Sequence, residues 1–278
     1  MPYRKVHLHL AVQPTPTSDN VIDFACAVAR EFEARLSVSS PRLKVSAPSH
    51  WLAGTMISGM AHEIEKDAAG RGLALEARLT QQASALGIPV QITRPVMDWP
   101  YASTGSSWSG RTSDVCVLGL PRQSTDQRLE VEDWLFGVGR PCLLCPDDSL
   151  HGFSLDRVLV AWDFSRSAAR AIGDAIPLLR RAKQVRVAVV RGEKDIPHAD
   201  AGEPLIEFLA AHGISGEVDE FEIEGRTVGQ AILENAKSAN ASLVVLGAFG
   251  HSRLKEFLLG GVTKEVLDSS RIPLFMSH

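Results

Sequence analysis

An internal repeat narrows the folds open to this 278-residue chain more than any other property of its sequence. The segment SDVCVLGLP (113–121) is similar to ASLVVLGAF (241–249), and GRPCLLCP (139–146) is similar to SRIPLFMS (270–277). The members of each pair lie about 130 residues apart. The chain therefore contains two copies of one structural unit.

A third pair of segments predicts where the two copies meet. KVHLHLAV (5–12) parallels RVLVAWDF (157–164), and each is an apolar strand pattern that leads into a helical pattern. This pair is about 150 residues apart, so the first copy has roughly 20 additional residues in its middle. The polar segment PDDSLHGFSLD (146–156) has the composition of a linker. The sequence thus predicts domains at residues 1–149 and 150–278.

Strand and helix patterns alternate along the second copy. The strand patterns lie at 158–162, 185–190, 218–223, 243–246 and 272–276. The helical patterns between them lie at 165–179, 202–211, 228–236 and 262–267. The first copy follows the same order, with a long helix through 56–86. Such alternation predicts two α/β units, each with an open, mostly parallel five-stranded sheet and helices on both faces.

Charge and hydropathy exclude several classes of function. With 29 basic and 33 acidic residues and a net charge of −4, the chain lacks the broad basic face that nucleic-acid binding requires. No segment approaches the ~20 consecutive apolar residues that span a bilayer. Four cysteines without framework spacing are typical of a reducing compartment. We expect a cytoplasmic protein that binds neither nucleic acid nor a membrane.

A glycine-rich segment follows the fourth strand pattern of the second copy. Gly247 and Gly250 allow the backbone to approach a ligand closely, because no Cβ intervenes. Gly260 and Gly261 open the last helix, whose N-terminal amides favour a phosphate, and Thr263 adds a hydroxyl in its first turn. In open parallel sheets, ligands bind at such loops beyond the carboxyl ends of the strands. The segment predicts an anion site built from backbone amides, although the P-loop pattern GxxxxGK[ST] is absent.

The spacing G-x2-G-x9-G at Gly247, Gly250 and Gly260 resembles the nucleotide-binding signature of the universal stress protein family, the UspA type. VAWDFS (160–165), which places an acid before a helix-capping serine, and the terminal RIPLFM (271–276) strengthen this resemblance. It covers the whole chain, more weakly in the first half, and implies a tandem protein that acts in stress responses. It also implies Rossmann-like sheets, similar to those of adenine-nucleotide alpha hydrolases, that are related by a pseudo-two-fold axis.

The resemblance further implies which residues would hold ATP or another adenine nucleotide, with Mg²⁺ as its accompanying cation. Asp163 would lie near the adenosine, and Val190 would contact the base. The glycine loop would contact the ribose and phosphates, and the start of the last helix would cradle the phosphates. The residues implied in these two segments are Leu246, Gly247, Phe249, Gly250, Gly260, Gly261, Val262 and Thr263.

The sequence departs from the family pattern at Gly261, where the usual residue is Ser or Thr. The missing hydroxyl removes a hydrogen bond of about 1 kcal/mol to the terminal phosphates, so ADP, AMP or no ligand competes with ATP. Each glycine alone also fits a tight turn or close helix packing, Asp163 fits a helix entry, and Thr263 fits an exposed helix surface. The first copy lacks the strand-end acid and the glycines, so only the second domain is expected to bind a nucleotide.

Other residue clusters indicate structure more than chemistry. Cys142 and Cys145 lie within one strand pattern, which is typical of core cysteines. His7 and His9 share a strand face, which favours hydrogen-bonded histidines over metal ligands. No catalytic or metal-ligating set can be placed, which predicts a binding protein that is not an enzyme. Slow ATP hydrolysis, adenylyl transfer and a vestigial loop on a partner-binding protein stay open as alternatives.

The family resemblance also implies how the two domains associate. The final strands of family members pair across a two-fold interface, so 143–145 and 274–276 are expected to pair within one chain. Both segments are apolar and would otherwise expose strand edges that invite pairing with other chains. Dimerisation of the whole chain stays open.

Overall fold

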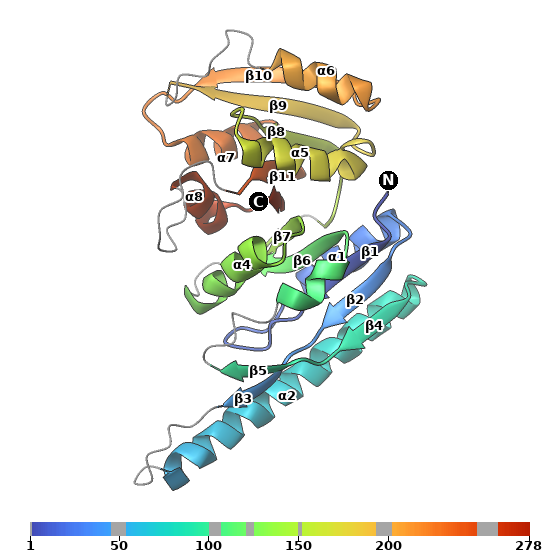
Figure 1. Cartoon of the computed structure of the whole chain (residues 1–278), viewed down its shortest axis with the longest axis vertical. Helices are drawn as coiled ribbons and strands as arrows, with labels where there is room; N and C mark the ends of the chain where they lie inside the picture. Colours follow the sequence, from blue (N-terminus) through green and yellow to red (C-terminus); the bar gives the residue numbers. More distant parts are fainter. Residues whose placement is uncertain are drawn as a thin grey trace. The chain divides into compact units, whose positions relative to one another are not determined.

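The computed structural model describes residues 2–45, 54–99, 107–120, 125–149, 152–192, 202–248 and 261–278. Two compact units form, Tyr3–Arg140 and Pro141–His278, and Figure 1 labels their elements. Both units are built from mostly parallel sheets and helices, which confirms the predicted α/β class.

The C-terminal unit contains five parallel strands in the order β10-β9-β8-β11-β12. Helices α5 and α6 cover one face of this sheet, and α7 and α8 lie on the other (Figure 1). The strands are β8 (Arg157–Ala161), β9 (Gln184–Arg191), β10 (Gly216–Glu222), β11 (Leu243–Gly247) and β12 (Leu274–Ser277). The helices are α5 (Arg166–Leu179), α6 (Glu203–Ala211), α7 (Val228–Ser238) and α8 (Gly261–Ser269).

A sixth, antiparallel strand completes the sheet of this unit. Strand β7 (Cys142–Pro146) pairs with β12 so that Leu144 lies opposite Leu274 and Cys142 opposite Met276. This pairing places β7 in the C-terminal compact unit, and the units therefore divide ahead of the predicted linker. The five strands expected in each sheet become six described strands here and four in the main sheet of the N-terminal unit.

The N-terminal unit has four parallel strands in the order β6-β1-β2-β4. Helices α1 and α2 pack together on one sheet face, and α4 covers the face of β1 that carries His7 and His9. The strands are β1 (Lys5–His9), β2 (Arg35–Ser39), β4 (Val90–Thr93) and β6 (Val115–Leu120). The helices are α1 (Asp19–Glu31), α2 (Gly54–Ala85), α4 (Thr125–Gly137) and the 3-10 helix η2 (Ser107–Thr112).

Two short strands in the N-terminal unit are absent from the sequence-based prediction. Strands β3 (Arg42–Val45) and β5 (Val96–Trp99) pair in parallel as a separate sheet, and β3 packs on α2. Charged and apolar residues alternate in β3 but not in β5, and each strand has only four residues, so the periodic signal is weak. These strands and the long α2 account for the additional length of the first copy.

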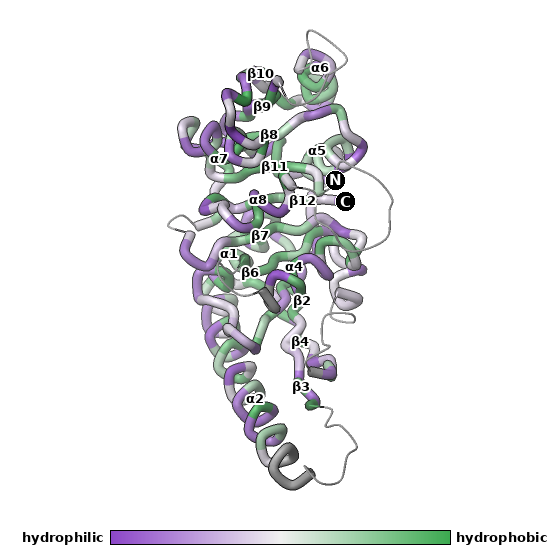
Figure 2. The backbone as a smooth tube through the Cα atoms, turned by 90° about the vertical axis from the view of Figure 1, so that its left-hand side faces the viewer, coloured by the Kyte–Doolittle hydropathy of each residue, from purple (hydrophilic) through white to green (hydrophobic). Residues whose placement is uncertain are grey.

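The core of each unit follows the apolar strand patterns. Residues 158–160 of β8 and 243–246 of β11 are buried, and these strands appear largely green in Figure 2. Strands buried on both faces read as continuous apolar runs, as the sequence predicted. Among the described residues, every helix is too short or too polar to cross a membrane.

Candidate functional site

The carboxyl ends of β8, β9 and β11 lie side by side in the C-terminal unit, because β8 pairs with both neighbours. In this register, the pairs 161–188 and 160–245 align the three strands just before their ends. Asp163 and Val190 each follow their paired residue by two positions, and Gly247 ends β11. The structure therefore brings these three predicted residues to one sheet edge. Their contact with a nucleotide remains a prediction.

Asp163 lies in the turn that leads from β8 into α5. Its Oδ1 accepts a hydrogen bond of 3.0 Å from the backbone N–H of Ser165. The Ser165 hydroxyl in turn accepts from the N–H of Ala168 at 3.0 Å, which confirms the predicted helix cap. Phe164 has a φ of 59°, and its ring lies 4.9 Å from that of Trp162. This aromatic pair beside the carboxylate was missed from the sequence, where the run W-D-F was its only signal.

Gly247 has a structural explanation that involves no ligand. A Cβ at this position would lie 2.4 Å from the carbonyl carbon of Ser167 and 2.5 Å from the nitrogen of Ala168. Backbone atoms cannot yield as a flexible side chain can, so only glycine lets β11 meet the first turn of α5. Close helix packing, which the sequence left open as an alternative to a ligand role, is therefore observed at this glycine. Leu246, which precedes it, is buried at 4% exposure and belongs to the core.

Helix α8 begins at Gly261, and space is open around that residue. A Cβ there would meet no heavy atom within 4 Å among the described neighbours. Val262 is half-buried, and Thr263 is buried at 3% exposure. The interpretation of Thr263 as exposed helix surface is therefore wrong, because α8 turns this residue towards the interior. Phe249, Gly250 and Gly260 lie outside the described residues, so their roles remain predictions.

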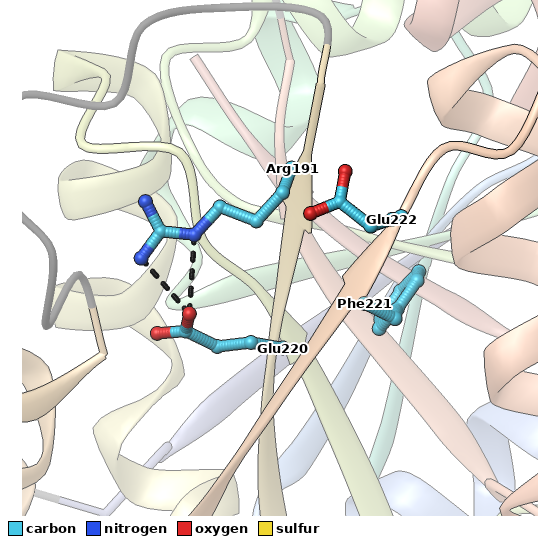
Figure 3. A pocket seen from close by; sticks show the side chains of 4 residues that line it. All are labelled: Arg191, Glu220, Phe221 and Glu222. Carbon is cyan, nitrogen blue, oxygen red and sulfur yellow. Dashed lines mark hydrogen bonds and ion pairs between the residues drawn. The ribbon is translucent and has the colours of Figure 1, made fainter.

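A cavity of about 430 Å³ lies at the carboxyl ends of β9 and β10 (Figure 3). Its lining consists of Arg191, Glu220, Phe221 and Glu222. The guanidinium of Arg191 donates to Oε2 of Glu220 from Nη2 at 2.9 Å and from Nε at 3.1 Å. Arg191 directly follows Val190, the residue predicted to contact the base. Sequence reasoning missed this charged cavity, although Arg191 lies next to one strand pattern and Glu220 and Glu222 lie within the other.

The cysteines and histidines occupy structural positions. All four cysteines are buried, and none forms a disulfide. Burial, with a smaller contribution from Asp147, raises the pKa of the Cys145 thiol to about 12, so this thiol stays protonated at neutral pH. The prediction of core cysteines in the CxxC segment is therefore confirmed. His7 and His9 are both hydrogen-bonded to Ser39, which confirms the interpretation of satisfied histidines. Within the described ranges, no group of three or more His, Cys, Asp or Glu residues is arranged to hold a metal ion.

Comparison with known proteins agrees with this arrangement. Residues 154–278 match the model of the universal stress protein family. Residues 154–278 of the C-terminal unit therefore form a universal stress protein domain. No curated protein matches the chain.

The likeness to solved structures extends over both units of this chain. A universal stress protein from Archaeoglobus fulgidus DSM 4304 is similar with a TM-score of 0.72 and 19% identity, over 98% of this chain and 97% of that chain. A protein of the same family name from Pseudomonas aeruginosa UCBPP-PA14 has a TM-score of 0.59 and 15% identity, over 99% of this chain and 93% of that chain. At these identities the likeness establishes the fold. The universal stress protein domain itself contains every residue predicted for the nucleotide site.

Proposed function

We propose that the universal stress protein domain binds an adenine nucleotide and that the chain is a regulatory binding protein in a stress response, without enzymatic activity. The placement of Asp163, Val190 and Gly247 at neighbouring strand ends supports this proposal most strongly. Ligands of open parallel sheets bind at this edge. ATP, ADP and AMP all carry the adenosine that these strand ends would contact, so the proposal covers all three.

The start of α8 fits the phosphate groups. No described heavy atom lies within 4 Å of a Cβ placed on its first residue, Gly261, which agrees with an approach of phosphate oxygens to the helix N-terminal amides. This cradle consists of backbone N–H groups, and it is therefore compatible with a chain whose net charge is −4. If ATP is the ligand, Mg²⁺ would neutralise part of the charge on its phosphates.

Replacing Asp163 by Asn tests the adenosine contact. The amide oxygen can still accept from the N–H of Ser165, so the turn into α5 should survive while the negative charge is lost. We expect ATP, ADP and AMP to bind roughly 10-fold more weakly, as for the loss of a charged hydrogen bond. Isothermal titration calorimetry measures this, with circular dichroism as the control for folding. Unchanged affinities for all three nucleotides would argue against the proposed site.

Replacing Gly261 by Ser tests the phosphate cradle. A Cβ at this position would meet no described heavy atom within 4 Å, and serine restores a hydroxyl at the helix start. We expect ATP affinity to rise about five-fold, corresponding to a hydrogen bond of about 1 kcal/mol. The matched control is Gly173→Ser, because Gly173 in α5 is also a helical glycine with open space around it. An equal effect of both substitutions would contradict a role for the start of α8.

The packing of Gly247 against α5 favours a second candidate function. In this alternative, the glycine loop is structural, and the protein acts only through surfaces that bind partner proteins. Mass spectrometry of small molecules released from the purified, denatured protein separates the two functions. A co-purified adenine nucleotide supports the first, whereas absence of both co-purified nucleotide and calorimetric binding supports the second. A Mg²⁺-dependent turnover assay tests the enzymatic alternatives, ATP hydrolysis and adenylyl transfer, and we expect no turnover.

We further propose that the last strands of the two repeats associate within one chain, that this pair can dimerise again, and that the protein acts in the cytoplasm. The antiparallel pairing of β7 with β12 supports the first of these proposals. The four cysteines without disulfides agree with a reducing compartment. Light scattering after size-exclusion chromatography gives the molecular mass of the full chain. A mass of one chain supports intramolecular pairing alone, and a mass of two supports the further dimer.

A further inference from the structure

A buried chain of hydrogen bonds joins β2, β1 and α4 in the N-terminal unit. It runs from Ser37 Oγ to His7 Nδ1 over 3.3 Å and from His7 Nε2 to Ser39 Oγ over 3.1 Å. It continues from Ser39 Oγ to His9 Nδ1 over 2.9 Å and from His9 Nε2 to Glu130 Oε1 over 2.8 Å. The residues His7 and His9 are 0% and 3% exposed. The four bonds connect the sheet interior to a carboxylate whose side chain is 20% exposed.

The strand register holds this chain in place. Parallel pairing of β1 with β2 sets His7 beside Ser37 and His9 beside Ser39. The ring of Trp134 on α4 lies over both imidazoles, with centroid distances of 5.4 Å to His7 and 4.8 Å to His9. The contact with Trp134 restricts the rotation of both imidazole rings. A change in protonation can therefore move protons between ring nitrogens while the heavy atoms keep their positions.

The chemistry of the groups allows one continuous direction for the four bonds when both imidazoles are neutral. A carboxylate only accepts, so His9 must donate to Glu130 from Nε2 and leave Nδ1 as an acceptor. Ser39 must then donate to His9 Nδ1, and its oxygen accepts from His7 Nε2. His7 Nδ1 is left as an acceptor for the Ser37 hydroxyl. In this state every donor points towards Glu130.

The same heavy atoms also satisfy the reverse arrangement, at the cost of one proton. A proton added to His9 occupies Nδ1, which must now donate to Ser39. Ser39 then donates to His7 Nε2, and His7 carries its own proton on Nδ1 and donates it to Ser37. We propose that His7 and His9 form a proton-operated relay, in which uptake of one proton at His9 reverses the chain and moves the His7 proton from Nε2 to Nδ1.

The surroundings of the two rings favour proton uptake at His9 and a change of tautomer at His7. Burial, and then the charges of His9 and Lys5, lower the pKa of His7 to about 3, so His7 stays neutral and changes only its tautomer. His9 instead contacts a carboxylate that stabilises its cation. The titratable groups around the two rings are Lys5 on β1, Cys116 opposite His7 on β6, Glu130 and Asp133 on α4, and Arg111 on η2. The two acidic residues of α4, Glu130 and Asp133, therefore lie near His9, the residue that takes up the proton.

The relay would couple pH to the contact between α4 and the sheet. When His9 is protonated, its bond to Glu130 becomes an ion pair, which is stronger than a neutral hydrogen bond. At the same time, His7 Nε2 turns from a donor into an acceptor for its second neighbour, Ser109 on η2, at 3.2 Å. Mild acidification would thus tighten α4 on β1 and reverse a bond to η2, without any movement of the backbone.

Nitrogen-15 NMR of the imidazole rings in the full chain tests the relay between pH 7.5 and 5. We expect neutral Nε2–H tautomers for both histidines at pH 7.5. On acidification, His9 should become an imidazolium while His7 changes to the neutral Nδ1–H tautomer, with the same midpoint. A His7 that keeps its tautomer while His9 titrates would overturn the proposal, as would a His9 that stays neutral throughout this range.

Two substitutions separate the relay from independent titration. Ser39→Ala removes the hydrogen-bonded path through Ser39 that joins the two rings, so His9 should still titrate while His7 no longer follows. The matched control is Ser37→Ala at the end of the chain, where the coupling of the two rings should persist. Glu130→Gln replaces the carboxylate by a neutral amide, so the ion pair between His9 and α4 should no longer form on acidification. Coupled titration that survives Ser39→Ala in a folded protein would refute the relay.

Discussion

At the scale of single residues, His7 makes the stability of the N-terminal unit depend on pH. Its pKa is lowered from 6.5 to about 3, chiefly by burial. The unfolded chain takes up this proton below pH 6.5 and the folded chain does not, so the stabilisation is complete above pH 6.5 and is lost towards pH 3. We expect a loss of about 2 kcal/mol at pH 5 relative to pH 7.5. Urea unfolding at both pH values measures this loss in the free energy of unfolding. His7→Gln should make the difference between the two pH values smaller. An unchanged difference would contradict the role given to His7.

Asp133 changes stability with pH in the direction opposite to His7. Burial first, and then Glu130, raise its pKa from 3.8 to about 6, and Oδ2 is buried without a hydrogen-bond partner among the described residues. The folded state holds this proton more tightly, so its contribution to stability is present below pH 3.8 and is lost as the pH rises through 6. Asp133→Asn should therefore raise the free energy of unfolding by about 1–2 kcal/mol at pH 7.5, after allowance for partial solvent screening, and little at pH 3.5. Denaturant titration checks this, with the exposed Glu63→Gln as the control. Equal effects at both pH values would be inconsistent with this pKa.

At the scale of elements, one glycine in β11 and one in α5 should respond oppositely to the same substitution. Gly247→Ala forces a Cβ into the backbone of the first turn of α5, so we expect a loss of about 1–3 kcal/mol. Gly173→Ala in α5 adds a methyl group in open space and improves helix propensity, so we expect a gain of up to about 1 kcal/mol. Thermal and urea unfolding measure both variants. A stable Gly247→Ala protein would show that α5 does not approach β11 as closely as described.

Sequence patterns predict those elements whose signal is local. The C-terminal strands and helices follow from apolar periodicity, and the cap of α5 follows from Ser165. The same reasoning missed β3 and β5, because a four-residue strand is stabilised by its partner strand, and in the case of β3 also by α2, more than by its own composition. At the candidate site, motif spacing singled out Asp163, Val190 and Gly247, whereas the ion pair of Arg191 with Glu220 depends on strand neighbours that no motif records.

At the scale of the whole molecule, the sequence repeat predicts two units but not which of them contains each strand. Strand β7 ends the first repeat in sequence, yet it belongs to the C-terminal compact unit. The cause is the register that places residues 142–144 opposite 274–276, a pairing between segments far apart in the chain. Apolar composition identified both segments as strands, but partner choice among apolar strands is a property of the assembled sheet.

The pairing of β7 with β12 leads to a prediction about the C-terminal domain in isolation. Residues 152–278 without β7 would expose one edge of β12, whose residues Leu274, Phe275 and Met276 are fully buried in the full chain. Because β12 accepts an antiparallel neighbour, a second copy of β12 can take the place of β7 across a two-fold axis. We expect this fragment to form a dimer at micromolar concentration, measured by light scattering after size-exclusion chromatography, with the full chain as the control. A folded fragment that stays monomeric would show that β12 does not need a partner along this edge.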